Sequence, residues 1–115
     1  MKKEELRIGN LVYDSVRNKE VQIQLKHFRE LYISEKMFFE RYKAIELTEE
    51  KLLGFGFFVY NKTMYLNRFT KGIFELEKFN NHFRLEGINR VVKLKYAHQL
   101  QNLYYSLKNE DLQIA

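Results

Sequence analysis

The chain contains no cysteine, no proline and no tryptophan, and only five of its 115 residues are glycine. The absence of cysteine excludes disulfides, thiolate metal sites and cysteine nucleophiles, and it allows a reducing compartment. The absence of proline removes the strongest marker of loops, so we place element ends by glycine and asparagine. No apolar run approaches the roughly 20 residues that cross a bilayer, and no signal-type apolar segment follows the charged start. We therefore expect a cytoplasmic protein without a membrane segment.

The residues that are present favour a folded domain with an aromatic core. Hydrophobic residues make up 45% of the chain, which contains ten Phe and eight Tyr. A chain of this length buries enough apolar surface to fold without disulfides or metal. We expect one domain that spans residues 1–115.

The net charge of +5 is unevenly distributed along the chain. Residues 1–50 carry ten Lys/Arg and ten Asp/Glu and are neutral, whereas residues 51–108 carry ten Lys/Arg and three Glu, a net charge of +7. Clustered cations favour a polyanionic or acidic partner, because they raise the local potential and the association rate. A surface that only keeps the protein soluble accounts for the charge equally well.

The first 45 residues predict strands. Residues 8–28 indicate a hairpin, or the start of a small barrel, with its turn at Asn18-Lys19 and alternating apolar residues from Val21 to His27. Residues 29–45 fit two interpretations. Leu31-Tyr32-Ile33 indicates a strand, whereas Ser34 could cap a helical turn. We favour a strand followed by a loop.

The middle of the chain predicts a short helix and then a β-meander. Thr48 is suited to cap the helix, which Gly54 and Gly56 would end. The short apolar segments that follow are separated by turn residues and indicate antiparallel strands. The predicted strands cover residues 57–60, 64–68, 73–77, 82–86 and 91–95.

Residues 96–107 predict an amphipathic helix that Asn109 would end in the left-handed conformation. Its apolar stripe, expected to pack on the sheet, contains Ala97, Leu100, Leu103, Tyr104 and Leu107. His98, Asn102 and Tyr105 point the other way, and we expect His98 to be a surface residue. The predicted fold class is therefore α+β.

Sequence spacing supports no metal or cofactor site. In a helix, His98 has Asn102 one turn on, where a metal site needs His, Asp or Glu. His82, Arg84 and Glu86 would share one strand face and could act on a phosphodiester. Such trios arise often on solvent-facing strands, so we expect no enzyme and keep a small ribonuclease as the less favoured alternative.

Basic and aromatic residues interleave through the meander, a combination that holds single-stranded nucleic acid. Most of the rings are needed for the core, so the candidate contact residues are fewer. Lys93 and Lys95 would lie on the strand face opposite Leu94, and Tyr105 on the polar side of the last helix. The candidate partner-binding residues are Arg84, Arg90, Lys93, Lys95, His98, Asn102 and Tyr105.

Three pieces of the chain resemble a family of small proteins from Bacteroidetes genomes, phages and mobile elements. They are residues 5–12 (Glu-Leu-Arg-Ile-Gly-Asn-Leu-Val), residues 45–53 together with Gly56-Phe57, and residues 98–104 (His-Gln-Leu-Gln-Asn-Leu-Tyr). The third piece is the most specific, because helix formation does not require its amides. Family members often have Pro in place of Glu46 and Trp in place of Lys51. The resemblance implies a shared fold and a mobile-element setting, and it supplies no activity.

That setting favours a non-enzymatic binding protein. Small proteins of this kind carried on phages often inhibit host defence, so we expect an inhibitor that docks on an RNA-guided nuclease, such as a CRISPR effector, as anti-CRISPR proteins do. The expected partner is a protein, and nucleic acid is a further candidate. The alternatives are a protein that binds single-stranded nucleic acid and the ribonuclease.

Overall fold

The computed structural model describes residues 1–62, 67–72, 74–79, 81–85 and 92–114, and its fold class is α+β, as predicted. The chain divides into two compact units. The N-terminal unit combines Met1–Ile45 with Tyr96–Leu112, and the meander unit combines Glu46–Lys95 with Gln113–Ala115. The expectation of one domain stays a prediction. No helix of the described residues is long and apolar enough to cross a membrane.

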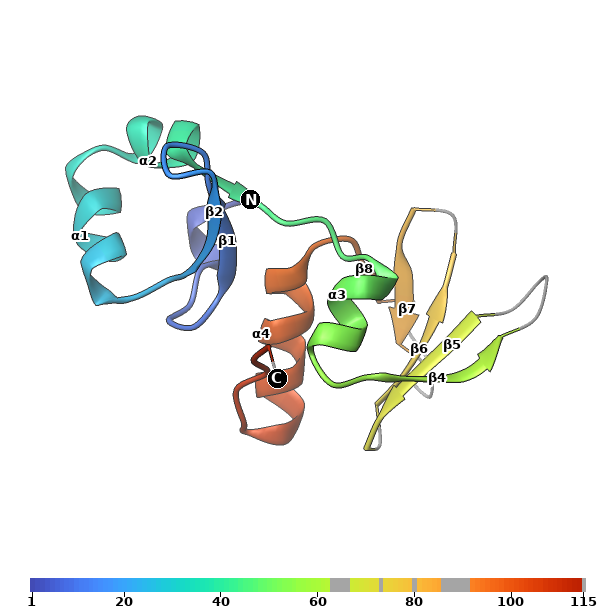
Figure 1. Cartoon of the computed structure of the whole chain (residues 1–115). Helices are drawn as coiled ribbons and strands as arrows, with labels where there is room; N and C mark the ends of the chain where they lie inside the picture. Colours follow the sequence, from blue (N-terminus) through green and yellow to red (C-terminus); the bar gives the residue numbers. More distant parts are fainter. Residues whose placement is uncertain (63–66, 73, 80, 86–91, 115) are drawn as a thin grey trace. The chain divides into compact units, whose positions relative to one another are not determined.

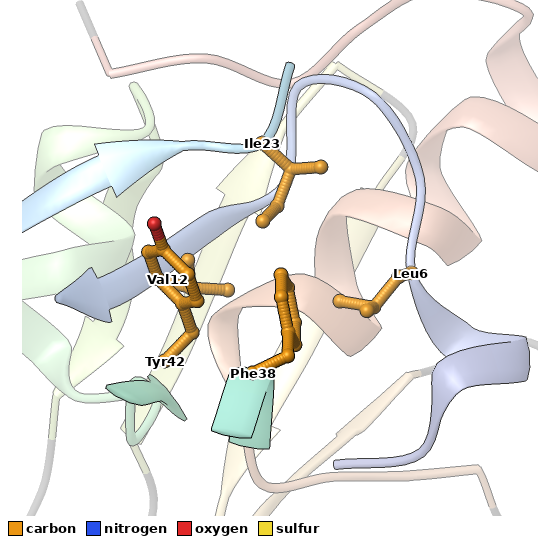
Figure 2. Close-up of a cluster of buried hydrophobic side chains, with 5 residues drawn as sticks. All are labelled: Leu6, Val12, Ile23, Phe38 and Tyr42. Carbon is orange, nitrogen blue, oxygen red and sulfur yellow. The ribbon is translucent and has the colours of Figure 1, made fainter. Parts of the chain in front are cut away.

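A three-stranded antiparallel sheet forms the centre of the N-terminal unit. Its strands, in spatial order, are β2 (Lys19–Gln22), β1 (Leu11–Asp14) and β3 (Tyr42–Ala44). The predicted hairpin is confirmed, because β1 pairs with β2 and Asn18 has a φ of 53° in the turn between them. One face of the sheet packs on a buried cluster (Figure 2) that consists of Leu6, Val12, Ile23, Phe38 and Tyr42.

The strand and loop predicted for residues 29–45 are wrong, because two helices and then β3 occupy this region, and the first helix also replaces the end of the strand predicted up to residue 28. The two helices are α1 (Leu25–Ile33) and α2 (Glu35–Arg41). The alternation that ends at His27 is accidental, since Phe28 and Leu31, three positions apart, pack against the buried cluster at helical spacing. Ser34 caps α2, because its hydroxyl accepts a hydrogen bond from the Met37 N–H over 3.3 Å.

The last helix, α4 (Ala97–Lys108), belongs to the N-terminal unit. It packs against β1 and against the short 3₁₀ helix η1 (Lys3–Glu5), and the β1–β2 hairpin lies between α1 and α4 (Figure 1). Asn109 ends the helix with a φ of 55°, as predicted. The predicted apolar stripe is correct at Leu100 and Tyr104, which are buried, and wrong at Leu107, which is 54% exposed.

The meander unit contains α3 (Glu49–Gly54) and a five-stranded antiparallel sheet whose strands follow one another in chain order (Figure 1), as predicted. Thr48 caps α3, since its hydroxyl accepts from the Lys51 N–H over 3.1 Å. The strands are β4 (Phe58–Lys62), β5 (Asn67–Lys71), β6 (Phe74–Lys78), β7 (Phe83–Leu85) and β8 (Lys93–Leu94).

One face of this sheet is apolar and buried. The strand register puts Phe69, Leu76 and Leu85 side by side, and all three are buried. At the edge of this face, Lys71 Nζ donates to the Phe55 carbonyl over 2.6 Å. Gly56 makes room for that lysine, because a Cβ at its φ of 91° would lie 3.0 Å from Lys71 Nζ. The opposite face of the sheet carries the charged residues.

Candidate cationic site

Charged side chains line up across the polar face of the meander. Glu77, Arg84 and Lys93 are paired in register across β6, β7 and β8, and Arg68 lies opposite Glu77 on β5. This row contains three cations and one carboxylate. Glu77 lies between Arg68 and Arg84. Because three cations outnumber one carboxylate, the row has a net charge of +2.

A second row lies next to the first on the same face. Its residues are two positions after Glu77, two before Arg84 and two after Lys93. Because side chains alternate along a strand, Phe79, His82 and Lys95 point to the same side as the first row. The N–H of Phe79 donates to the His82 carbonyl over 2.9 Å, which extends the β6–β7 ladder by one pair. We define the cationic site as the three cations of the two rows on or next to β7 and β8, together with the histidine between them; it consists of Arg84, Lys93, Lys95 and His82.

Planar groups stack at the centre of this site. The rings of Phe79 and His82 are 5.3 Å apart and only 7° from parallel. The guanidinium of Arg84 lies 4.0 Å from the centre of the Phe79 ring, and its Nε donates to Nε2 of His82 over 3.2 Å. The arginine is therefore held in place as a flat cation against an aromatic ring.

His82 is held as a neutral imidazole. Its Nε2 accepts from Arg84, so the proton sits on Nδ1, which donates to Oδ1 of Asn81 over 2.8 Å. Desolvation lowers the pKa of His82, and the nearby charges of Arg84, Lys93 and Lys95 lower it further. The same charges that disfavour a protonated histidine would attract an anion.

The structure brings together part of the predicted contact set. Arg84, Lys93 and Lys95 belong to the cationic site, and the predicted alternation is confirmed, because Lys93 and Lys95 are exposed while Leu94 is buried. Arg90 and Glu86 lie outside the described residues, so the trio proposed for a ribonuclease is described only at His82 and Arg84. Nε2 of His82, which would serve as a base, already accepts a hydrogen bond from Arg84.

The other three predicted contact residues lie in α4 of the N-terminal unit, and each has a partner within that unit. The expectation that His98 is a surface histidine is wrong, because its exposed fraction is 0% and its Nε2 lies 2.9 Å from a carboxylate oxygen of Glu5. Asn102 donates to the Glu5 carbonyl over 2.6 Å. The ring of Tyr105 lies 3.8 Å from the guanidinium carbon of Arg7. Their predicted role toward a partner stays a prediction.

Sequence reasoning missed two residues that organise these regions. Gln101 is buried, and its side chain joins α4 to the backbone at Gly9, Leu11 and Leu112. Phe79 supplies the ring on which Arg84 lies, but it follows the predicted strand 73–77 and precedes a turn. Pairing of Phe79 with His82, the residues on either side of positions 80 and 81, would have found it.

Among the described residues, no group of three or more His, Asp or Glu side chains could hold a metal ion. Comparison of the chain with protein-family models, curated proteins and solved structures gave no match. The physical properties of the cationic site therefore carry the functional argument.

Proposed function

We propose that this chain is a non-enzymatic binding protein whose cationic site docks on an RNA-guided nuclease and inhibits it. The observation that carries the proposal is the placement of Arg84, Lys93 and Lys95 around His82 on one sheet face, where desolvation and then these charges lower the pKa of His82. A fixed group of cations favours an acidic protein surface or a phosphate backbone, because desolvating an unmatched cation on binding is costly. The resemblance to mobile-element proteins supports a defence nuclease as the target, and we expect the protein to act in the cytoplasm.

Co-purification with CRISPR effectors, followed by cleavage assays with and without the protein, tests this proposal. We expect the wild-type protein to bind one effector and to slow its cleavage. Lys93→Glu combined with Lys95→Glu should abolish both effects, because the substitutions reverse two charges on exposed positions of the site. Unaltered cleavage by every effector of the host would refute the inhibitor role.

A matched control separates the cationic site from net charge. Lys2→Glu combined with Lys36→Glu changes the net charge by the same amount at exposed positions of the N-terminal unit. This control should retain binding and inhibition. Equal loss in both double variants would mean that overall charge, rather than the cationic site, drives the association.

A second candidate function is binding of single-stranded nucleic acid without a protein partner. The stacked Phe79, His82 and Arg84 groups favour it, because aromatic rings and guanidinium planes stack on unpaired bases while lysines hold phosphates. Affinity of the purified protein for single-stranded RNA and DNA should then fall steeply with salt. Absence of binding at low salt would remove this candidate.

A further inference from the structure

Two adjoining depressions form a groove on the N-terminal unit, a surface separate from the cationic site. One has a volume of about 380 Å³ and polar walls, and the other has a volume of about 190 Å³ and mostly apolar walls. They share Glu30, Arg41 and Tyr42, so these three residues divide a single groove into two chambers. Pockets of this size class hold small ligands or single side chains of a partner.

The apolar chamber lies between α1 and α2. Its floor contains the buried rings of Phe38 and Tyr42, which also belong to the core cluster (Figure 2). Its rim contains Ile33 and Met37, which are 76% and 69% exposed. Apolar side chains gathered around a concave surface are typical of a site that takes an apolar group from a partner. The chamber has room for one large side chain.

The polar chamber is lined by charges of both signs and has a small positive excess. Its four cations and three carboxylates, a net charge of +1, are Arg17, Lys19, Lys26, Arg41, Asp14, Glu20 and Glu30. Its buried carboxylate, Asp14, is matched by a two-pronged ion pair with Arg41, whose Nε and Nη2 each lie 3.0 Å from a carboxylate oxygen. Glu30 accepts the Tyr42 hydroxyl over 2.9 Å. The side-chain ammonium groups of Lys19 and Lys26, on the chamber wall, make no hydrogen bond or ion pair with the described residues.

The wall between the chambers has a fixed charge state. Burial, with the Glu30 hydrogen bond, raises the pKa of Tyr42 to about 12, so its hydroxyl stays protonated and donates. Beside this wall, buried His27 lines the polar chamber; its Nδ1 accepts from the Gln24 N–H and desolvation lowers its pKa, so it stays neutral. These side chains are therefore preorganised, so binding of a partner requires no further loss of their conformational entropy.

We propose that this groove binds a short acidic peptide segment of a partner protein. A large apolar side chain of the segment fills the chamber between Ile33 and Met37. A neighbouring Asp or Glu enters the polar chamber and pairs with Lys19 and Lys26. Charge complementarity favours this occupant, because the polar chamber has a net charge of +1 and the apolar chamber adjoins it.

Selection from a random phage-displayed library of peptides against the wild-type protein tests the proposal. We expect enriched sequences with a large apolar residue within a few positions of Asp or Glu. Synthetic versions should bind at least tenfold more weakly to Met37→Glu, and also to Lys19→Glu combined with Lys26→Glu. These positions are exposed, so the variants should fold, and Ile33→Ser serves as a second apolar variant.

Two controls keep the outcome specific. The first control, Tyr32→Glu, changes an aromatic residue of α1 that is 91% exposed and lies outside the groove. The second, Lys93→Glu with Lys95→Glu, reverses two charges in the meander unit. Both should bind the peptides as the wild type does. Failure to enrich any peptide, enrichment of basic peptides, or equal binding by Met37→Glu would overturn the proposal. Self-association of the wild type that Met37→Glu abolishes would instead assign the groove to a second copy of the chain.

Discussion

The side-chain amide of Asn10 donates a hydrogen bond to Oδ1 of Asn102 over 2.8 Å, although the two residues are 92 positions apart in the chain. Beside this bond, Gln101 accepts from the Leu11 N–H over 2.7 Å and donates to the Gly9 carbonyl over 3.0 Å. The polar side of α4 therefore holds the segment that leads into β1. Because buried polar groups need partners, these amides fix the register between helix and strand.

Substitution of Gln101 by Leu should lower the free energy of unfolding by about 3 kcal/mol, since it leaves the Leu11 N–H and the carbonyls of Gly9 and Leu112 without their partner. Leu107→Gln on the same helix should change it by no more than about 0.5 kcal/mol, because Leu107 is exposed. Urea unfolding monitored by circular dichroism measures both. Amphipathic periodicity alone predicts the opposite order, so a larger loss in Leu107→Gln would contradict the structure.

Local signals predicted the meander, the caps at Thr48 and Asn109 and the hairpin turn, because each depends on neighbouring residues. The side of α4 that carries His98 and Gln101 could not be predicted in this way. Periodicity sorts residues by polarity, whereas these two are buried through hydrogen bonds to residues 5–11, about 90 positions away. Burial of polar groups depends on tertiary partners that one helix does not encode.

The candidate site was predictable to a similar extent. Strand alternation placed Lys93 and Lys95 on one face, but it could not place Phe79 against Arg84, because that contact depends on the β6–β7 register. Residues 25–41 were misread because the alternation from Val21 to Ile23 happened to continue into the first turn of α1. The small positive excess of the polar chamber likewise became apparent only in three dimensions.

Asp14 should make the protein sensitive to acid. The hydrogen bond from Arg41 holds the pKa of this buried carboxylate at about 2, compared with an ordinary value of 3.8. Asp14 is therefore protonated more readily in the unfolded chain than in the folded one. The stabilisation that its ionised form gives the folded state is present above about pH 4 and is lost as the pH falls toward 2. Asp14→Asn should be less stable by about 2 kcal/mol at pH 5, with a difference that shrinks toward pH 2. Urea unfolding at several pH values checks this, and a constant difference would contradict it.

His82 should contribute a separate pH dependence near neutrality. Because its folded-state pKa lies below the ordinary value of 6.5, the unfolded chain binds the proton more readily, and stability should decline as the pH falls below about 6.5. His82→Gln removes this titration and should flatten the decline between pH 7 and pH 5. His27, whose pKa is also lowered, is unchanged in the variant and serves as the internal reference. Parallel stability curves for the two proteins would show that folding does not lower the pKa of His82.

Two substitutions should separate charge from stacking if the cationic site binds single-stranded nucleic acid. Lys93→Ala with Lys95→Ala removes two phosphate contacts, so the slope of log affinity against log salt should become shallower by about 1.4. Arg84→Lys keeps the charge but loses the flat group over Phe79, so the slope should stay the same while the affinity falls by about 1 kcal/mol or more. Fluorescence anisotropy with labelled single strands at several salt concentrations measures both quantities, and thermal melting of each variant confirms that it is folded. A shallower slope in Arg84→Lys, or an unchanged affinity, would show that Arg84 acts only as a point charge.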